Sequence, residues 1–531
     1  MIPVIIIATL VAFGIAKLYI PAAIVIWDES AYIHWAYRVY HALKVGDFTN
    51  LWQITRLQFL YSPLTSWTIG APLVPFGFSV YSARIAGLVW FIVCSALVYG
   101  IGHMFDRRKS RTVGTISSLL FITSPLMILY AGVAMREMPG AALTLAVLYF
   151  YFVARKTDSV ISWFTSACFL IALSFERYNY GVLVAAAILL EAGIHIWKSK
   201  RRIETVIRYV FLFAPTALTM SWWVFTPTNR LYEFLAVLKN VAWVLPGDTN
   251  TWGHIFFYPY EILVMSGPSV LIGALVLVSI VFAIFHLRDY RIRMLWILFM
   301  LNLVIAEIHT TNMEERFLVT SLPALFIMSA YIAVDAYTSL KKSLKNKVFV
   351  CILYGILLLV GGKVAYDVYY LPQFVYSVGS FVGKTAFFNQ KTIPDRYYEY
   401  DESTWVKKTW PDVMHERPQD VVTYVISQVD LGKPVDVVGR ANELAPDYFT
   451  FLFDLSRDNG TYPRLSNPSY TVTVEVLPNS MYYTKDFLSF NAFIVPVIRQ
   501  VAEDPSLVLL SSKDFKELGV SVHIYVPRSR E

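Results

Sequence analysis

Residues 3–26, PVIIIATLVAFGIAKLYIPAAIVI, form an apolar stretch that runs directly into Trp27-Asp28-Glu29. The stretch is long enough to cross a bilayer as a helix, which takes about 20 residues. Two adjacent carboxylates where a span leaves the membrane are costly to hold there, so they indicate a functional site. They also suit a structural role, because Asp28 or Ser30 could cap a helix that begins just after them. Position alone leaves both interpretations open.

The composition predicts a membrane protein. The 531 residues are 56% hydrophobic and only 16% charged, whereas soluble domains carry about 25% charged residues. The net charge of +7 does not indicate a nucleic-acid partner, because most basic residues lie in short turns between apolar runs. Cys94, Cys168 and Cys351 all fall inside apolar runs, so they predict neither a disulfide framework nor a metal site.

Apolar runs of span length recur through the first 370 residues, which predicts a polytopic α-helical membrane protein with about eleven transmembrane helices. The first run lacks a basic leader and a small-residue cleavage site, so we expect it to be retained. The runs are 3–26, 79–102, 112–131, 139–154, 159–175, 180–197, 206–226, 264–287, 292–309, 317–338 and 348–370.

The short turns between these runs are alternately basic and acidic. The positive-inside rule then predicts a multi-pass plasma-membrane protein whose N-terminus is cytoplasmic and whose chain after residue 370 is extracytoplasmic. The basic turns are Arg107–Arg111, Arg155-Lys156, Lys198–Arg202, Arg288–Arg293 and Lys341–Lys347.

Two domains follow from this topology. We predict a transmembrane domain over residues 1–375, with outer-face loops at 27–78 and 227–263, and an extracytoplasmic α/β domain over residues 376–531. Within the first loop, residues 30–43 show the apolar spacing of an amphipathic helix. In the outer domain we expect helices at 421–430 and 442–460 and strands at 434–439, 470–477, 491–498, 506–512 and 520–526.

Ionisable side chains collect at the predicted outer ends of the spans. Carboxylates there can take the proton of an attacking hydroxyl, and arginines can stabilise a leaving phosphate. A sugar carried on a lipid phosphate would react through an oxocarbenium-like transition state that suits such a site. The group consists of Asp28, Glu29, Arg84, Arg136, Glu137, Glu176, Arg177, Glu307, His309, Glu314, Glu315 and Arg316.

Structural roles are open for each of these side chains. Glu137 could anchor the start of its span, and Glu176 and Arg177 could neutralise each other. Arg84 could extend to the lipid headgroups, and Arg316 could pair with the acids that precede it. The common location of the group, rather than any one residue, favours a catalytic site.

Four stretches resemble the GT-C superfamily of membrane glycosyltransferases, and in particular the branch with protein O-mannosyltransferases and lipid A aminoarabinose transferases. Each combines an acid or arginine with a characteristic aromatic or proline neighbour at an outer span end. They are WDESAY at 27–32, YSPLTSWTIGAPLVPFGFSVYSARIAGLVW at 61–90, MREMPGAALTLAVLYFYF at 135–152 and EERFLVTSLPALFIMSAY at 314–331.

The resemblance implies an inverting glycosyltransferase that uses a polyprenyl- or dolichyl-phosphate-linked sugar donor on the outer face. Asp28 would be the catalytic base, Glu29 would position it or the acceptor, and Glu137 would be the second active-site acid. Arg316 would hold the donor phosphate, and the acceptor would be a glycan, a lipid or a protein.

One stretch departs from the family pattern. Many aminoarabinose-type relatives have Thr-Lys at the outer end of the fifth span, where this chain has SFERYNYG at 174–181. Arg177 is the cation available there for phosphate, with Arg84 as a further phosphate-binding candidate. Some relatives hold a divalent cation on outer-loop acids, so a divalent cation is a possible cofactor, and no His/Cys spacing requires a metal.

Other functions remain open from sequence. A protein O-mannosyltransferase fits the Asp-Glu pair, although the C-terminal pattern does not resemble a β-trefoil. An oligosaccharyltransferase is less favoured, because the C-terminal domain lacks a WWD-type signature. A lipid or solute transporter would carry acids near the bilayer midplane, and we expect the acids to lie at one face. A non-catalytic membrane subunit would retain the same motifs without turnover.

Overall fold

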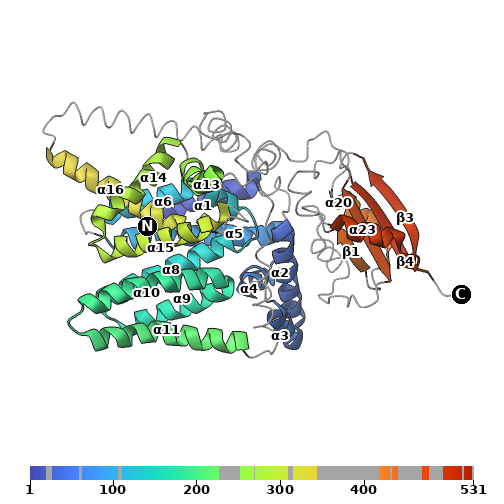
Figure 1. Ribbon diagram of the computed structural model, residues 1–531, viewed down its shortest axis with the longest axis horizontal. Coiled ribbons are helices and arrows are strands. Elements are labelled where there is room, and N and C mark those ends of the chain that lie inside the picture. Colours follow the sequence, from blue (N-terminus) through green and yellow to red (C-terminus); the bar gives the residue numbers. More distant parts are fainter. Residues whose placement is uncertain are drawn as a thin grey trace.

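The computed structural model of the chain is a helical region followed by a small C-terminal sheet (Figure 1). The predicted fold class, a polytopic α-helical membrane protein with a C-terminal α/β region, is confirmed. The described residues are 1–19, 27–58, 63–105, 110–225, 251–267, 270–308, 315–343, 418–430, 433, 435–439, 469–476, 494–516 and 520–528.

Helices contain all the apolar runs that lie within these residues. The first half of the region contains α1 (Ile2–Gly14), the π-helix η1 (Ile15–Tyr19), α2 (Trp27–Val45), α3 (Phe48–Leu57), α4 (Pro63–Gly70), η2 (Ala71–Leu73), α5 (Val80–Gly102), α6 (Ser110–Thr123), α7 (Pro125–Ala131) and α8 (Glu137–Thr157). The second half contains α9 (Val160–Glu176), α10 (Tyr178–Lys198), α11 (Arg202–Phe225), α13 (Thr251–Met265), α14 (Val270–Ala283), η3 (Ile284–His286), α15 (Tyr290–Ile308), η4 (Glu315–Leu318) and α16 (Leu322–Ser343).

Five of the described helices are long and apolar enough to cross a membrane: α5, α8, α10, α11 and α16. The helices α6 and α7 make a sixth candidate if they are one span bent by 64°. Pro125 explains this bend, because its ring excludes the preceding Ser124 from the helical conformation, and Ser124 is extended at ψ 122°. The last predicted span, 348–370, lies outside the described residues.

Three features of the helical region differ from the sequence-based expectations. Helix α2 begins at Trp27 rather than after Ser30, so neither Asp28 nor Ser30 is its cap. Helix α13 occupies part of the predicted loop 227–263; its Trp, Tyr and Pro residues look loop-like in sequence. The expectation that acids lie at one face is wrong for Glu191, which is fully buried within α10.

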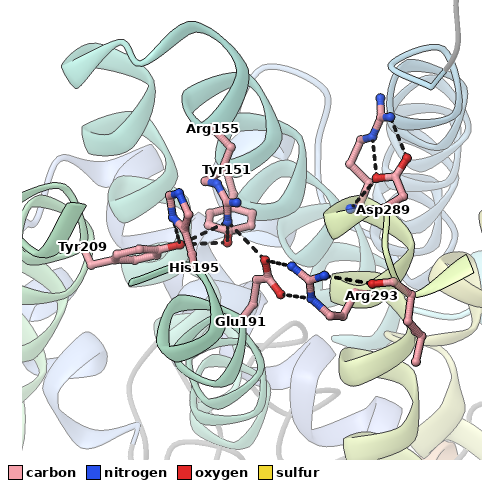
Figure 2. Close-up of polar contacts among 9 residues, drawn as sticks. Tyr151, Arg155, Glu191, His195, Tyr209, Asp289 and Arg293 are labelled. Carbon is pink, nitrogen blue, oxygen red and sulfur yellow. Dashed lines mark hydrogen bonds and ion pairs between the residues drawn. The ribbon is translucent and has the colours of Figure 1, made fainter. Parts of the chain in front are cut away.

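Glu191 belongs to a buried polar network that joins four helices (Figure 2). It accepts hydrogen bonds from Arg293 of α15 at 2.6 and 2.8 Å and from Arg155 of α8 at 3.3 Å. Arg155 also donates to the hydroxyls of Tyr151 and Tyr209, which brings α11 into the network. Because Glu191 compensates two mostly buried cations, it can lie inside a span that sequence patterns alone would treat as apolar.

The C-terminal sheet has the strand order β1-β2-β4-β3. Strands β1 and β2 pair in parallel, and β4 pairs antiparallel with both β2 and β3. Apolar side chains of α20, among them Val421 and Val425, pack with the sheet into one core. The elements are α20 (Pro418–Gln428), β1 (Val435–Gly439), β2 (Tyr470–Val476), α23 (Ile494–Glu503), β3 (Leu507–Phe515) and β4 (Val520–Pro527).

The predicted helix at 421–430 and four of the predicted strands are present. The predicted strand at 491–498 is wrong, because α23 begins at Ile494. The branched residues there favour a strand by composition, but Ile494, Val497, Ile498 and Val501 have the i, i+3, i+4, i+7 spacing of an amphipathic helix. The predicted helix at 442–460 lies outside the described residues.

The Glu191 network predicts a large stability effect. Glu191→Gln removes the negative charge and leaves Arg155 and Arg293 uncompensated, so we expect unfolding in detergent to become easier by roughly 3 kcal/mol. Chemical denaturation of the purified variant measures this. Glu204→Gln is the matched control, since Glu204 pairs with Arg201 at 3.4 Å on the surface and should change stability by less than about 1 kcal/mol. Equal effects of the two substitutions would contradict the role of the network.

Candidate functional site

The buried ion pair between Glu29 and Arg84 connects helix α2 to helix α5. Arg84 donates to Glu29 through Nε and Nη2, each at 2.7 Å, and the backbone N–H of Ala134 donates to the same carboxylate at 2.8 Å. Glu29 is fully buried and Arg84 is 2% exposed. The contact therefore places the first turn of α2 beside the start of α5 and the segment that leads into α8.

Asp28 precedes Glu29 in the first turn of α2, and its side chain lies outside the described residues. The second predicted active-site acid, Glu137, is the first residue of α8 and is fully buried. Neither of its carboxylate oxygens has a hydrogen-bond partner among the described residues. Its ion pair with Arg177, at 3.7 Å, is longer than a hydrogen bond. A buried carboxylate in this state is a strong candidate for contact with a substrate.

Glu176 and Arg177 do not neutralise each other, because the chain changes direction between them. Helix α9 ends at Glu176, and Arg177 is extended, with φ −159° and ψ 120°, before α10 begins at Tyr178. Arg177 donates to the Tyr180 hydroxyl at 2.5 Å, and its guanidinium also lies 5.4 Å from the centre of the Phe317 ring. Glu176 instead accepts a hydrogen bond from Thr65 of α4 at 2.7 Å.

Arg316 lies on η4 and is 8% exposed, with its guanidinium 5.8 Å from the Phe317 ring centre. The side-chain amide of Asn302, on α15, holds this turn by donating to the Phe317 carbonyl and to the Ser321 hydroxyl, both at 2.7 Å. Asn302 was not among the residues predicted from sequence. An asparagine within an otherwise apolar span was the signal that could have identified it.

Arg136 brings these groups into one electrostatic cluster. Its guanidinium lies 5.4 Å from the centre of the Tyr32 ring. Burial lowers the pKa of Arg136, but Tyr32, Glu137 and Tyr180 together outweigh the burial and raise this pKa above its usual value, while Arg316 lowers it slightly. Glu176 also interacts electrostatically with Arg136 and Glu137. We call Arg136, Glu137, Glu176, Arg177 and Arg316 the charged cluster.

The charged cluster and the Glu191 network lie at opposite ends of the helices. Glu137 and Arg155 are both on α8, and at 1.5 Å per residue they are separated by about 27 Å along the helix axis. This distance is close to the hydrocarbon thickness of a bilayer, about 30 Å. The charged cluster therefore lies near one membrane boundary, as the sequence predicts for its members.

The remaining predicted site residues divide into two groups. Arg84 is engaged with Glu29, and its phosphate-binding role stays a prediction. Glu307 is partly buried on α15, whereas His309 and the side chains of Glu314 and Glu315 lie outside the described residues. Within the part of the chain that the structure describes, no group of three His, Cys, Asp or Glu side chains could hold a metal ion.

Comparison with known proteins agrees with this geometry. Residues 61–225 match the family described as dolichyl-phosphate-mannose-protein mannosyltransferase, and no curated protein matches the chain. The fold is similar to that of ArnT from Cupriavidus metallidurans in the apo state, with a TM-score of 0.58 and 15% identity over 98% of this chain and 97% of that chain. ArnT bound to undecaprenyl phosphate gives a TM-score of 0.55 and 16% identity over the same shares.

A more distant similarity of fold extends to a second membrane protein. The apo oligosaccharyltransferase of Archaeoglobus fulgidus has a TM-score of 0.50 and 10% identity, over 86% of this chain and 64% of that chain. The chain therefore shares its overall fold with ArnT, and this likeness, together with the family match over residues 61–225, agrees with the resemblance predicted from its sequence motifs.

Proposed function

We propose that the chain is an inverting glycosyltransferase that moves a sugar from a polyprenyl-phosphate donor to an acceptor at the outer membrane face. The observation that carries this proposal is the charged cluster, in which three arginines surround two buried carboxylates. If both carboxylates are ionised, the cluster has a formal charge of +1. This charge complements a phosphodiester donor, which carries one negative charge.

The reaction follows from the charges. An acceptor hydroxyl loses its proton to Asp28, and its oxygen attacks the anomeric carbon of the sugar. The bond between this carbon and the phosphate oxygen breaks, and its electron pair stays on the phosphate. The leaving group is then polyprenyl phosphate, and the negative charge on its phosphate increases from −1 towards −2. Arg177 and Arg316 would stabilise this increase because they are fixed in place before the reaction begins.

The relatives support the donor class. ArnT has been crystallised with undecaprenyl phosphate, which is the expected by-product here.

The proposal also includes a membrane topology. The N-terminus is cytoplasmic, and residues 376–531 form an extracytoplasmic domain attached to the membrane domain of residues 1–375. In this orientation the charged cluster faces the side on which acceptors are displayed.

Protein O-mannosyl transfer is a second candidate function, favoured by the family match over residues 61–225. It specifies dolichyl-phosphate mannose as donor and a protein hydroxyl as acceptor. The first candidate leaves the acceptor as a glycan, a lipid or a protein. Transfer of labelled mannose to a Ser/Thr-rich peptide by the purified enzyme would separate the two.

Binding of the by-product tests the proposal without knowledge of the sugar. Undecaprenyl phosphate at about 100 times its dissociation constant should stabilise the protein by about 2.7 kcal/mol, measured as a shift in melting temperature. Arg316→Ala and Arg177→Ala should each remove most of this shift. Arg208→Ala is the control, because Arg208 is a partly exposed arginine that pairs with Asp158. A wild-type protein that shows no shift would count against a lipid-phosphate substrate.

The base is tested separately. Asp28→Asn keeps the size of the side chain and removes its ability to take a proton, so we expect transfer to fall by at least about 100-fold. Undecaprenyl phosphate should still stabilise the variant as it does the wild type. Single-turnover transfer from a radiolabelled donor measures the rate. Retention of most of the wild-type rate would show that another group is the base.

A further inference from the structure

Glu176 is a buried carboxylate in which one oxygen accepts a hydrogen bond from the described residues and the other accepts none. Its side chain is fully buried at the end of α9. Oε1 accepts the hydrogen bond of the Thr65 hydroxyl at 2.7 Å. Oε2 is also buried, and no described residue donates a hydrogen bond to it. Because Thr65 holds one oxygen, the orientation of the other is set before any substrate arrives.

The surroundings of Glu176 make this state unfavourable in the free protein. Burial disfavours the ionised form of Glu176 most strongly, and Glu137 adds a smaller charge repulsion; the hydrogen bond from Thr65 and the charge of Arg136 offset these effects only in part. A buried acceptor without a donor loses its hydration without compensation. The network around Glu191 shows the alternative, because both of its carboxylate oxygens receive donors from the protein itself. The unpaired Oε2 of Glu176 is therefore suited to receive a hydrogen bond from a ligand.

The chemical nature of Oε2 of Glu176 determines which ligand group can bind there. The ionised carboxylate of Glu176 only accepts hydrogen bonds, so a hydroxyl or amino group that donates to Oε2 stabilises this form against the neutral form that burial favours, whereas a phosphate is repelled by it. In a sugar linked to lipid phosphate these two parts are adjacent. The arginines of the charged cluster suit the phosphate, and Glu176 suits the polar substituents of the ring.

We propose that Glu176, oriented by Thr65, binds a hydrogen-bond-donating substituent of the donor sugar and so distinguishes the loaded carrier from the spent one. This inference rests on the proposed function. Under this inference, the stretch SFERYNYG, which replaces the Thr-Lys pattern of relatives, contributes to recognition of the sugar. Helix α4 also has a role in the site, since α4 supplies Thr65.

The test compares the unloaded carrier, a phosphate monoester, with the same carrier linked to a sugar through a phosphodiester; wild type and variants are measured with the same lipids, so the charge difference is common to all of them. Equilibrium binding of undecaprenyl phosphate and of undecaprenyl-phosphate-linked hexoses and pentoses is measured for the full-length protein in detergent. The ratio of the two dissociation constants is the readout. Glu176→Gln can still accept from Thr65 but places an amide NH2 where Oε2 lies. We expect it to bind the loaded lipid about tenfold more weakly and the unloaded lipid as the wild type does.

Thr65 provides an independent pair of variants. Thr65→Val removes the hydroxyl at nearly constant volume and should reduce the preference for the loaded lipid, whereas Thr65→Ser keeps the hydroxyl and should restore it. These variants also test the inference if Glu176→Gln does not fold. Glu191→Gln is the control for buried carboxylates, and it should lower stability without changing the ratio of dissociation constants.

Several outcomes would overturn the inference. An unchanged ratio of dissociation constants in Glu176→Gln, or equally weakened binding of both lipids, would remove Glu176 from sugar recognition while the proposed function stands. A change confined to the KM of the acceptor assigns Glu176 to the acceptor instead. Failure of the wild type to bind either lipid would reject the proposed function itself.

Discussion

The site depends on the Glu29–Arg84 pair. Two hydrogen bonds of 2.7 Å, together with the N–H of Ala134, attach the first turn of α2 to two separate segments of the helical region. Charges buried this completely are tolerated only when both partners remain in place. The pair therefore restricts where the backbone of Asp28 can lie, since Asp28 is adjacent to Glu29. The ion pair of Glu29 thus sets the backbone position of the residue that we propose as the base.

The charged cluster has the opposite character. The Glu29–Arg84 pair and the Glu191 network satisfy their carboxylates within the protein, whereas Glu137 and Glu176 keep oxygens without hydrogen-bond donors. Unpaired buried carboxylate oxygens are unfavourable in the free protein, and the ligand that we propose, with its phosphate and hydrogen-bond donors, would compensate them. Burial also strengthens each interaction, because the local dielectric constant is far below that of water. This contrast separates structural charges from functional ones in the same molecule.

Sequence patterns predicted the helices well and the contacts between them poorly. Apolar length located every described span, because the bilayer allows few alternatives to a helix of about 20 residues. Local composition misled at residues 494–503, where branched side chains favour a strand but their spacing is helical. Glu191 was overlooked because a single acid in an apolar run gives no sign of two arginines on other helices.

The same limit explains why the roles of Glu176 and Arg177 could not be read from their order. Adjacent opposite charges suggest a pair, but the extended backbone at Arg177 turns the two side chains apart. Each then finds partners far away in sequence: Thr65 lies 111 residues from Glu176, and Phe317 packs on Arg177. The sequence could place both residues at a membrane boundary, whereas only the packing of α4, α9 and η4 shows which partner each one has. For a site assembled from helix ends, the sequence therefore predicts the location and the chemical type of its residues, whereas the geometry requires the structure.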